Sequence, residues 1–283
     1  MSPFALVVSA LVAVQAAAPV VSVPASIERD EAKGLVKLNI PDLGQAAESP
    51  PSGWCGEASI QQALLFLGAW FPQKEINRAG KPAHRDLYAS EIPGALKNLH
   101  VRFRFSPRDR DLDAFIRWIK AEIDLGHPVL TGMKIYPTAH PEWTLDHFTL
   151  AVGHEKDALV VNTTWKDQRT IATAHLRSTN ASLAFENASG RYWGASILGP
   201  DAGGRGLPAR LFVEREDGRS VEVVVKCEGL EPGAEYQVLR ASSFGAEGER
   251  LATFTATAAV HAVRTTIARD VPAVFRCAAS SSP

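Results

Sequence analysis

Cys55 and His147 are the two residues whose types and settings point most directly to covalent chemistry. Cys55 lies between Trp54 and Gly56, immediately before an apolar stretch typical of a helix. The partial positive charge of a helix N-terminus stabilises a thiolate, which is the nucleophilic form of cysteine. His147 follows 92 residues later and can act as the base that removes the thiol proton. The sequence therefore predicts a cysteine nucleophile paired with a histidine base.

Asn162 is the third polar residue of this candidate site. It closes the strand-like run that follows His147, fifteen residues further along the chain. Two apolar runs around the polar turn 155–157 are typical of a hairpin, in which we expect His147 and Asn162 to come close to facing each other. An amide at that position can orient the imidazole ring. Asn162 also begins an Asn-X-Thr glycosylation sequence, and a glycan there would exclude a buried catalytic role.

The elements that must position these residues follow from the spacing of apolar side chains. Helices are expected from Cys55 to a stop at Gly68, over 91–99 with Ser90 as N-cap, and over 109–125. Strands are expected over 34–40, 101–105, 128–135, 147–153 and 158–162. Helices followed by paired strands indicate the α+β class.

The C-terminal quarter of the chain has a different pattern. Residues 199–208 are rich in glycine and proline and have the composition of a linker. Six short strands are then expected, over 209–214, 220–227, 235–240, 250–256, 259–267 and 273–277. Such regular short strands predict a small β-sandwich over residues 209–278.

Three cysteines are present, and two of them, Cys227 and Cys277, end strands of the predicted sandwich. In an exported protein they are the natural candidates for a disulfide, which would leave Cys55 as the free thiol. The alternative is that all three are reduced residues with a packing role. In that interpretation Cys55 is a small buried apolar residue at a helix start.

The N-terminal residues resemble a secretory signal. An eleven-residue apolar run over 4–14 is followed by small residues, which predicts a signal peptide over 1–18 and a secreted or periplasmic protein. The alternative is a buried N-terminal strand or helix. Residues 19–50 are then an N-terminal extension. No other segment is long and apolar enough to cross a bilayer, so no span is expected in the mature chain.

The distribution of charged residues and of possible metal ligands bears on which partners and cofactors to expect. Thirty basic and 31 acidic residues nearly cancel, and no long run of one sign occurs, so bulk charge gives no reason to expect a nucleic-acid partner. The histidines are scattered, and no cysteine or histidine pair has the spacing of a zinc site. We therefore expect neither a metal nor a cofactor.

The sequence Trp-Cys-Gly-Glu-Ala at 54–58, followed by an apolar helix, is similar to the nucleophile motif of papain-like cysteine peptidases. The closest resemblance is to the bacterial peptidases that cut double-glycine leader peptides. Those proteins also have a Gly-x-Pro-Val-like strand, here 126–129, and a histidine that begins an apolar strand, here 147–150. The resemblance covers roughly residues 50–170 and implies a papain-like domain over 51–198. Residues 229–236 resemble part of a fibronectin type III domain.

The chain departs from that family pattern at two positions. Family members place a glutamine shortly before the nucleophile to complete the oxyanion hole, but Ser49 stands there, and Gln45 lies four residues further upstream. The third residue is Asn162 instead of the aspartate usual in the leader peptidases. The resemblance therefore assigns the oxyanion role to Gln45 together with the Cys55 N–H.

The resemblance implies an exported thiol hydrolase that acts on a peptide or protein substrate and cleaves a peptide or other amide bond. Cys55 would form a thioester, His147 would transfer protons, and Asn162 would orient His147. Two alternatives stay open. One is an acyl-transfer enzyme on the same scaffold. The other is a catalytically inactive papain-like binding protein, in which the C-terminal part does the binding.

Overall fold

The computed structural model describes residues 24–51, 53–81, 83–107, 111–185, 191–201, 206–207 and 209–280. The predicted signal peptide over 1–18 and much of the predicted linker lie outside these residues. Within them, helices and antiparallel strands are combined, which confirms the α+β class. No helix of the described residues is long and apolar enough to span a membrane.

An eight-stranded antiparallel sheet forms the larger part of the structure. Its main path runs β1-β2-β6-β5-β9-β4, and β7 and β8 continue from β6. The strands are β1 Ile27–Asp30, β2 Leu35–Leu38, β4 Val101–Phe105, β5 Val129–Met133, β6 His147–Glu155, β7 Ala158–Asn162, β8 Gln168–Ala172 and β9 Gly194–Pro200. The strand that begins at His147 is therefore central, and its first seven residues are all buried.

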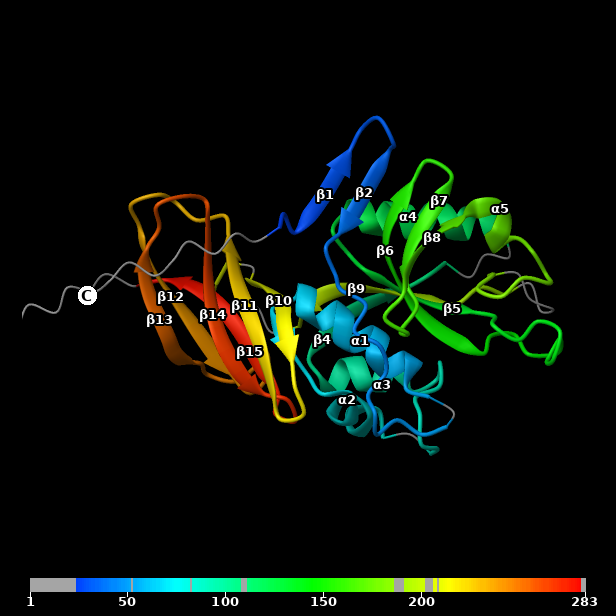
Figure 1. The fold of residues 1–283 in the computed structure, drawn as a ribbon, viewed down its shortest axis with the longest axis horizontal. Helices are drawn as coiled ribbons and strands as arrows, with labels where there is room; N and C mark the ends of the chain where they lie inside the picture. Colours follow the sequence, from blue (N-terminus) through cyan, green and yellow to red (C-terminus); the bar gives the residue numbers. More distant parts are fainter. Residues whose placement is uncertain are drawn as a thin grey trace, which may run out of the picture.

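Helices cover both sides of this sheet. They are α1 Cys55–Phe66, α2 Gln73–Gly80, α3 Ile92–Asn98, α4 Leu112–Asp124 and α5 Thr173–Leu176. In Figure 1, α1 crosses in front of the sheet, with α2 and α3 beside it, whereas α4 lies behind β2 and β6. Every residue of α1 after Cys55 is buried, as in a helix enclosed on all sides by a core. The nucleophile candidate is thus the first residue of a rigidly packed element.

Two smaller antiparallel sheets, here called the C-terminal sheets, lie at the left of Figure 1. One is ordered β10-β11-β14 and the other β13-β12-β15-β3. Their strands are β10 Ala209–Glu216, β11 Ser220–Glu228, β12 Glu235–Ala241, β13 Glu249–Thr255, β14 Val260–Ala268 and β15 Ala273–Ala279, joined by β3 Ala69–Trp70 from the N-terminal half. Alternate residues of the facing strands, such as Val223, Val238 and Phe275, share one core.

The two parts of the structure are joined directly. Strand β3 leaves the end of α1 and pairs with β15, so a piece of the N-terminal half completes a C-terminal sheet. The indole Nε1 of Trp70 donates to the carbonyl of Arg269 at 3.0 Å. The guanidinium of Arg210 lies 4.1 Å from the ring centre of Phe66. The C-terminal sheets therefore pack against the helix that carries Cys55.

Most elements were predicted close to their observed limits, and two differences have a clear cause. Ser90 is not the N-cap of α3, because Glu91 holds that position and its carboxylate accepts from the amide of Tyr88. Helix α4 begins at Leu112, since the side chain of Asp111 caps it by accepting from Asp113 N at 2.8 Å. The predicted start at Asp109 lies outside the described residues. The elements β1, α2, β3, β8, β9 and α5 were not predicted.

Cys227 and Cys277 lie side by side in the core of the C-terminal sheets. Both are fully buried in the same core, and their thiols lie close enough for each to shift the pKa of the other. The neighbouring Cys277 thiol and burial raise the pKa of Cys227. The structure holds them as free thiols, so the disulfide between them stays a prediction.

Candidate active site

Cys55 is the first residue of α1, and its thiol points at the start of β6. Its Sγ accepts a hydrogen bond from the amide of Phe148 at 3.4 Å. Phe148 follows His147 directly, so the thiol lies against the peptide that joins the two residues. Gly56 packs against Phe148, and a Cβ there would lie in van der Waals contact with the ring at 3.4 Å. The structure therefore brings the Cys55 thiol to the strand residue next to the predicted base.

The electrostatic setting of Cys55 differs from the sequence expectation. Burial raises the pKa of its thiol to about 12, although the Phe148 amide opposes the shift. The negative charges of Glu57 and Asp86 raise the pKa further. The helix N-terminus alone does not provide a thiolate here, because removing the sulfur from water outweighs the helix charge. A nucleophilic Cys55 therefore needs a cation beside it when the proton leaves.

The hydrogen bond of the His147 ring shows which of its two nitrogens carries the proton. Its Nε2 lies 2.8 Å from the carbonyl oxygen of Thr163. A carbonyl only accepts hydrogen bonds, so Nε2 carries the proton and the lone pair of the neutral ring is on Nδ1. Burial lowers the pKa of His147, which is 4% exposed, and so favours the neutral ring in the resting state. Such a ring is a base at neutral pH.

Trp165 covers one face of this imidazole. The two ring centres are 4.5 Å apart and the planes are 23° from parallel. The indole itself is 43% exposed, so its other face is open to solvent. It shields the contact between His147 and Thr163 from water.

The structure does not bring Asn162 to His147. In the β6–β7 hairpin Asn162 pairs with Leu150, because Glu155 pairs with Ala158 across a two-residue turn; the bulge after Ala151 moves the pairing only one residue toward His147. Leu150 is three residues beyond His147, or about 10 Å along a strand. The Asn162 amide donates to the carbonyls of residues 40 and 41 and to Gln62, and its oxygen accepts from Gln168. It is fully buried, so its amide is not accessible to glycosylation in the folded chain.

Asp42 is a site residue that the sequence analysis missed. Its Oδ2 accepts from the amides of Thr163 at 2.7 Å, Thr164 at 3.1 Å and Asp167 at 3.2 Å. These amides belong to the loop that supplies the carbonyl partner of His147. Asp42 precedes that loop by more than a hundred residues, and no motif marks it.

Gln45 reaches the nucleophile despite its distance in sequence. Two turns shorten the intervening chain, closed by hydrogen bonds from Ser49 N to Ala46 O and from Gly53 N to Pro50 O. Its Oε1 accepts from the amide of Trp54 at 2.6 Å, and its Nε2 lies 3.4 Å from the Thr164 hydroxyl. That hydroxyl is also 3.4 Å from His147 Nε2. Gln45 is therefore held between Trp54, which precedes the nucleophile, and the loop of residues 163–167 that contacts His147, here called the histidine loop.

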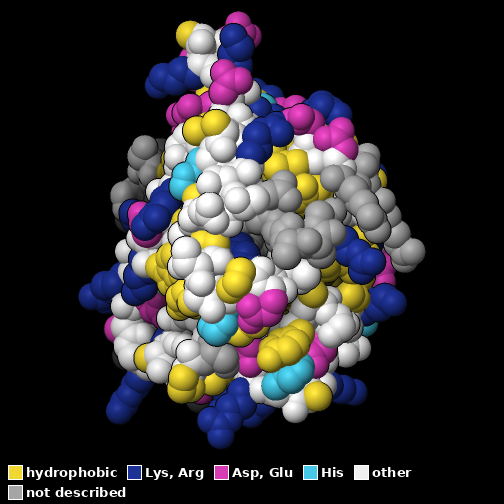
Figure 2. Space-filling view, turned by 90° about the vertical axis from the view of Figure 1, so that its right-hand side faces the viewer, with side chains coloured by type: hydrophobic (Ala, Val, Ile, Leu, Met, Phe, Trp, Pro, Cys, Tyr) yellow, Lys and Arg dark blue, Asp and Glu magenta, His cyan; other side chains and the backbone are white. Residues whose placement is uncertain are grey.

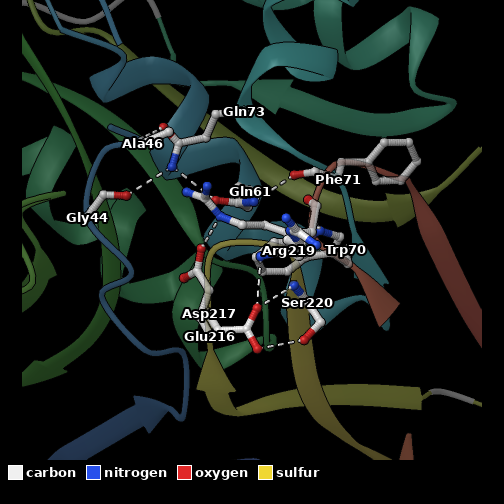
Figure 3. A network of polar contacts seen from close by, with 11 residues as sticks. Gly44, Ala46, Gln61, Trp70, Phe71, Gln73, Glu216, Asp217, Arg219 and Ser220 are labelled. Atoms are coloured by element: carbon white, nitrogen blue, oxygen red, sulfur yellow. Dashed lines mark hydrogen bonds and ion pairs between the residues drawn. The ribbon is translucent and has the colours of Figure 1, made fainter. Parts of the chain in front are cut away.

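A pair of buried glutamines fixes the loop that carries Gln45 (Figure 3). The Gln73 side chain donates to Gly44 O at 2.9 Å and accepts from Ala46 N at 2.8 Å, so it brackets Gln45 on both sides. Gln61, on α1, accepts from Gln73 at 3.0 Å and donates to Phe71 O at 2.8 Å. This network ties the loop to the helix of Cys55.

A cavity of about 740 Å³ lies beside this network. Gln45 and Lys166 line it from loops of the N-terminal half, and Arg219 and Arg269 line it from the C-terminal sheets, whereas neither Cys55 nor His147 is among its lining residues. Figure 3 shows Glu216, Asp217, Arg219 and Ser220, from the ends of β10 and β11 and the turn between them, below the glutamine pair, with Asp217 accepting from the amides of Arg219 and Ser220. The volume is within the range of small-molecule and peptide sites.

Glu57 is a buried carboxyl two residues after the nucleophile. Its Oε1 accepts from Asn77 Nδ2 at 2.7 Å and from Leu87 N at 3.0 Å. Its Oε2 is buried with no hydrogen-bond partner among the described residues. Burial raises the pKa of Glu57 to about 7. Below that pH the carboxyl is neutral and does not repel a Cys55 thiolate, whereas above it the charge of Glu57 raises the pKa of the thiol.

Charged side chains on the outer surface show no single pattern. Figure 2 shows the side of the molecule at the right of Figure 1, where Lys and Arg side chains lie mostly around the edge and are mixed with Asp and Glu. Among the described residues, no group of three or more His, Cys, Asp and Glu is arranged to hold a metal ion.

No family model, curated protein or solved structure matches this chain. The site must therefore be interpreted from its own geometry.

Proposed function

We propose that the chain is a thiol hydrolase of papain-like type, which cleaves a peptide or other amide bond through a thioester on Cys55. The observation that supports it best is the Cys55 thiol 3.4 Å from Phe148 N, at the residue next to a histidine whose lone pair is on Nδ1. Gln45 is hydrogen-bonded to the residue before the nucleophile. In this proposal α1 and the eight-stranded sheet belong to the papain-like domain, and the C-terminal sheets form the β-sandwich.

The reaction would proceed in two halves. His147 Nδ1 takes the proton from Cys55, and the thiolate sulfur attacks the carbonyl carbon of the amide. The resulting oxyanion accepts hydrogen bonds from the Cys55 N–H and the Gln45 amide. The carbon–nitrogen bond breaks as Nδ1 returns the proton to the amine. Water, deprotonated by Nδ1, then attacks the thioester and releases the acid and the free thiol.

The raised pKa of Cys55 has a direct consequence for this mechanism. A buried thiolate without a cation is unfavourable, so the proton must remain on His147 as the sulfur attacks. The imidazolium formed in this way is the cation that the site otherwise lacks. Its proton on Nε2 stays bonded to Thr163 O throughout.

One observation favours a second candidate, an inactive papain-like binding protein. Burial holds the Cys55 thiol neutral in the resting structure, where Gln45 Nε2, the donor that an oxyanion would need, lies 3.4 Å from the Thr164 hydroxyl. Such a protein would bind peptides in the cavity beside Gln45 without cleaving them. Acyl transfer differs from hydrolysis only in the nucleophile of the second half-reaction.

The test is cleavage of a defined peptide mixture by residues 19–283 and by its Cys55→Ala and Cys55→Ser variants, followed by mass spectrometry. The proposal expects products with new carboxyl termini from the unsubstituted chain alone, and hydroxamates when hydroxylamine is added. Products from Cys55→Ala at the same rate would overturn it. Binding of the peptides with no cleavage by any form would favour the second candidate.

A further inference from the structure

We infer that Asp42 is a positioning residue for His147 and acts through the single peptide group between Thr163 and Thr164. The inference rests on the proposed function, and it gives Asp42 the orienting role for which the sequence analysis named Asn162. Asp42 differs from a third residue that is hydrogen-bonded directly to the histidine, because its carboxylate does not contact the imidazole.

One peptide group links the two side chains. Its carbonyl, from Thr163, lies 2.8 Å from His147 Nε2. Its amide, from Thr164, donates to Asp42 Oδ2 at 3.1 Å. The C=O and N–H of a peptide share one delocalised system, so a negative charge at the N–H end makes the oxygen a stronger acceptor. The carboxylate thereby strengthens the bond that fixes the proton on Nε2.

Asp42 is held in place by several donors. Besides three loop amides, it accepts from Gly44 N and from Gln62 Nε2, both at 3.2 Å. None of the ion pairs of the described residues involves Asp42, so its charge is not neutralised by a lysine or arginine. It also joins the histidine loop to the loop of Gln45.

The backbone of the histidine loop is in a costly conformation. Thr164 has φ of 68° and Lys166 has φ of 63°, in the left-handed region that side chains disfavour. A β-branched residue is especially rare there, and such strain persists only where surrounding contacts enforce it. The hydrogen bonds that Asp42 accepts from the amides of Thr163, Thr164 and Asp167 are among those contacts. They keep the Thr163 carbonyl directed at His147.

Two carboxylates act on the imidazole by charge, namely Asp146 and Asp42. Only Asp42 is joined to it through hydrogen bonds. Asp146 instead accepts from the amides of Ile135 and Tyr136. Around Cys55 the charged groups are Glu57 and Asp86. Removing the charge of Asp146 therefore tests charge alone, whereas removing that of Asp42 tests charge and orientation together.

The experiment compares Asp42→Asn with two matched controls, Asp167→Asn and Asp146→Asn. Asp167 lies on the same loop, but its carboxylate is exposed and pairs with Arg169. Each protein spans residues 19–283. Nitrogen-15 NMR reports which ring nitrogen of His147 is protonated, and steady-state kinetics report kcat and KM on a cleaved peptide. Asp42→Glu is the second variant, because it retains the charge if Asp42→Asn fails to fold.

We expect the unsubstituted chain and both controls to keep the neutral His147 proton on Nε2. Asp42→Asn should populate both tautomers and lower kcat by about 10- to 100-fold, as loss of an outer partner commonly does, with little change in KM. Asp42→Glu should keep the Nε2 tautomer and most of kcat. An unchanged tautomer and kcat in Asp42→Asn would overturn the inference and leave the proposed function standing. Absence of cleavage by the unsubstituted chain would count against the proposed function, and the NMR comparison would still decide the role of Asp42.

Discussion

Gly53 leaves the space that the side chain of Gln45 occupies. A Cβ on Gly53 would lie only 2.6 Å from Gln45 Oε1, and the residue has φ of 88°. The glycine just before the nucleophile motif is therefore required by a close approach and by its backbone conformation. It allows a glutamine ten positions before Cys55 to take part in the site.

The first prediction concerns this contact. Gly53→Ala should displace Gln45 and lower kcat by about 10- to 100-fold, comparable to removal of one oxyanion donor by Gln45→Ala. The two effects should not add, because the double variant has no Gln45 amide left to displace. If the fold-decrease in kcat of the double variant equals the product of the two single decreases, Gly53 acts by another route. The measurement is kcat for the four proteins of the cycle.

The second prediction concerns Gln73. Gln73→Leu removes the bonds that bracket Gln45, so the loop should move and kcat should fall, while the unfolding free energy falls by about 1–3 kcal/mol. Lys74→Leu is the matched control, since Lys74 is the exposed next residue. Equal kcat in Gln73→Leu and Lys74→Leu would contradict a role for Gln73 in holding the loop.

The third prediction concerns the pH dependence of stability. The pKa of Glu57 is raised from 4.5 to about 7, so the folded chain holds a proton that the unfolded chain has released. Its stabilising contribution is complete below about pH 4.5 and is lost as the pH rises to about 7, a change of about 3 kcal/mol. Glu57→Gln should remove most of this slope.

Denaturant unfolding at several pH values between 4 and 8 measures this change. Glu57→Gln should be close to the unsubstituted chain at the acid end and more stable than it at pH 8. Glu28→Gln, an exposed position on β1, serves as the control and should leave the slope unchanged. A Glu57→Gln variant with the original slope would show that Glu57 is not the titrating group.

The fourth prediction concerns the two thiols of the C-terminal core. Because the thiols of Cys227 and Cys277 already lie close together, folding with an oxidant should join them and leave Cys55 as the one free thiol. Closing this loop should raise the unfolding free energy by up to about 4 kcal/mol relative to the reduced protein. Thiol counting and unfolding with and without reductant measure both effects. Three free thiols after oxidative folding would contradict it.

The strands and long helices were predictable because their apolar residues follow one period. Strand β7 begins and ends as expected, and the buried stripe of α4 is the one expected from spacing. Helix α2 was missed because it is short and polar, with Ile76 as its one buried apolar residue. Its place is fixed by tertiary contacts instead of its own pattern.

The candidate site was predictable only where local sequence decides the chemistry. Cys55 and His147 stand out from their own neighbours, and the structure brings the Cys55 thiol to the amide of Phe148, the residue after His147. Asn162 was assigned from a hairpin register, but Glu155 pairs with Ala158 across a two-residue turn, so Asn162 lies opposite Leu150 and not opposite His147. Asp42 could not be predicted, because its contacts join loops that are far apart in sequence.

The most direct test of the central claim is the rate at which iodoacetamide alkylates Cys55 between pH 4 and 10, in the unsubstituted chain and in His147→Ala. We predict that the unsubstituted chain reacts well below the ordinary thiol pKa of about 8.5, because His147 accepts the proton. His147→Ala should react only in the alkaline range, since burial alone raises the pKa of Cys55 to about 12. Identical pH profiles in the two proteins would contradict the pairing of Cys55 with His147.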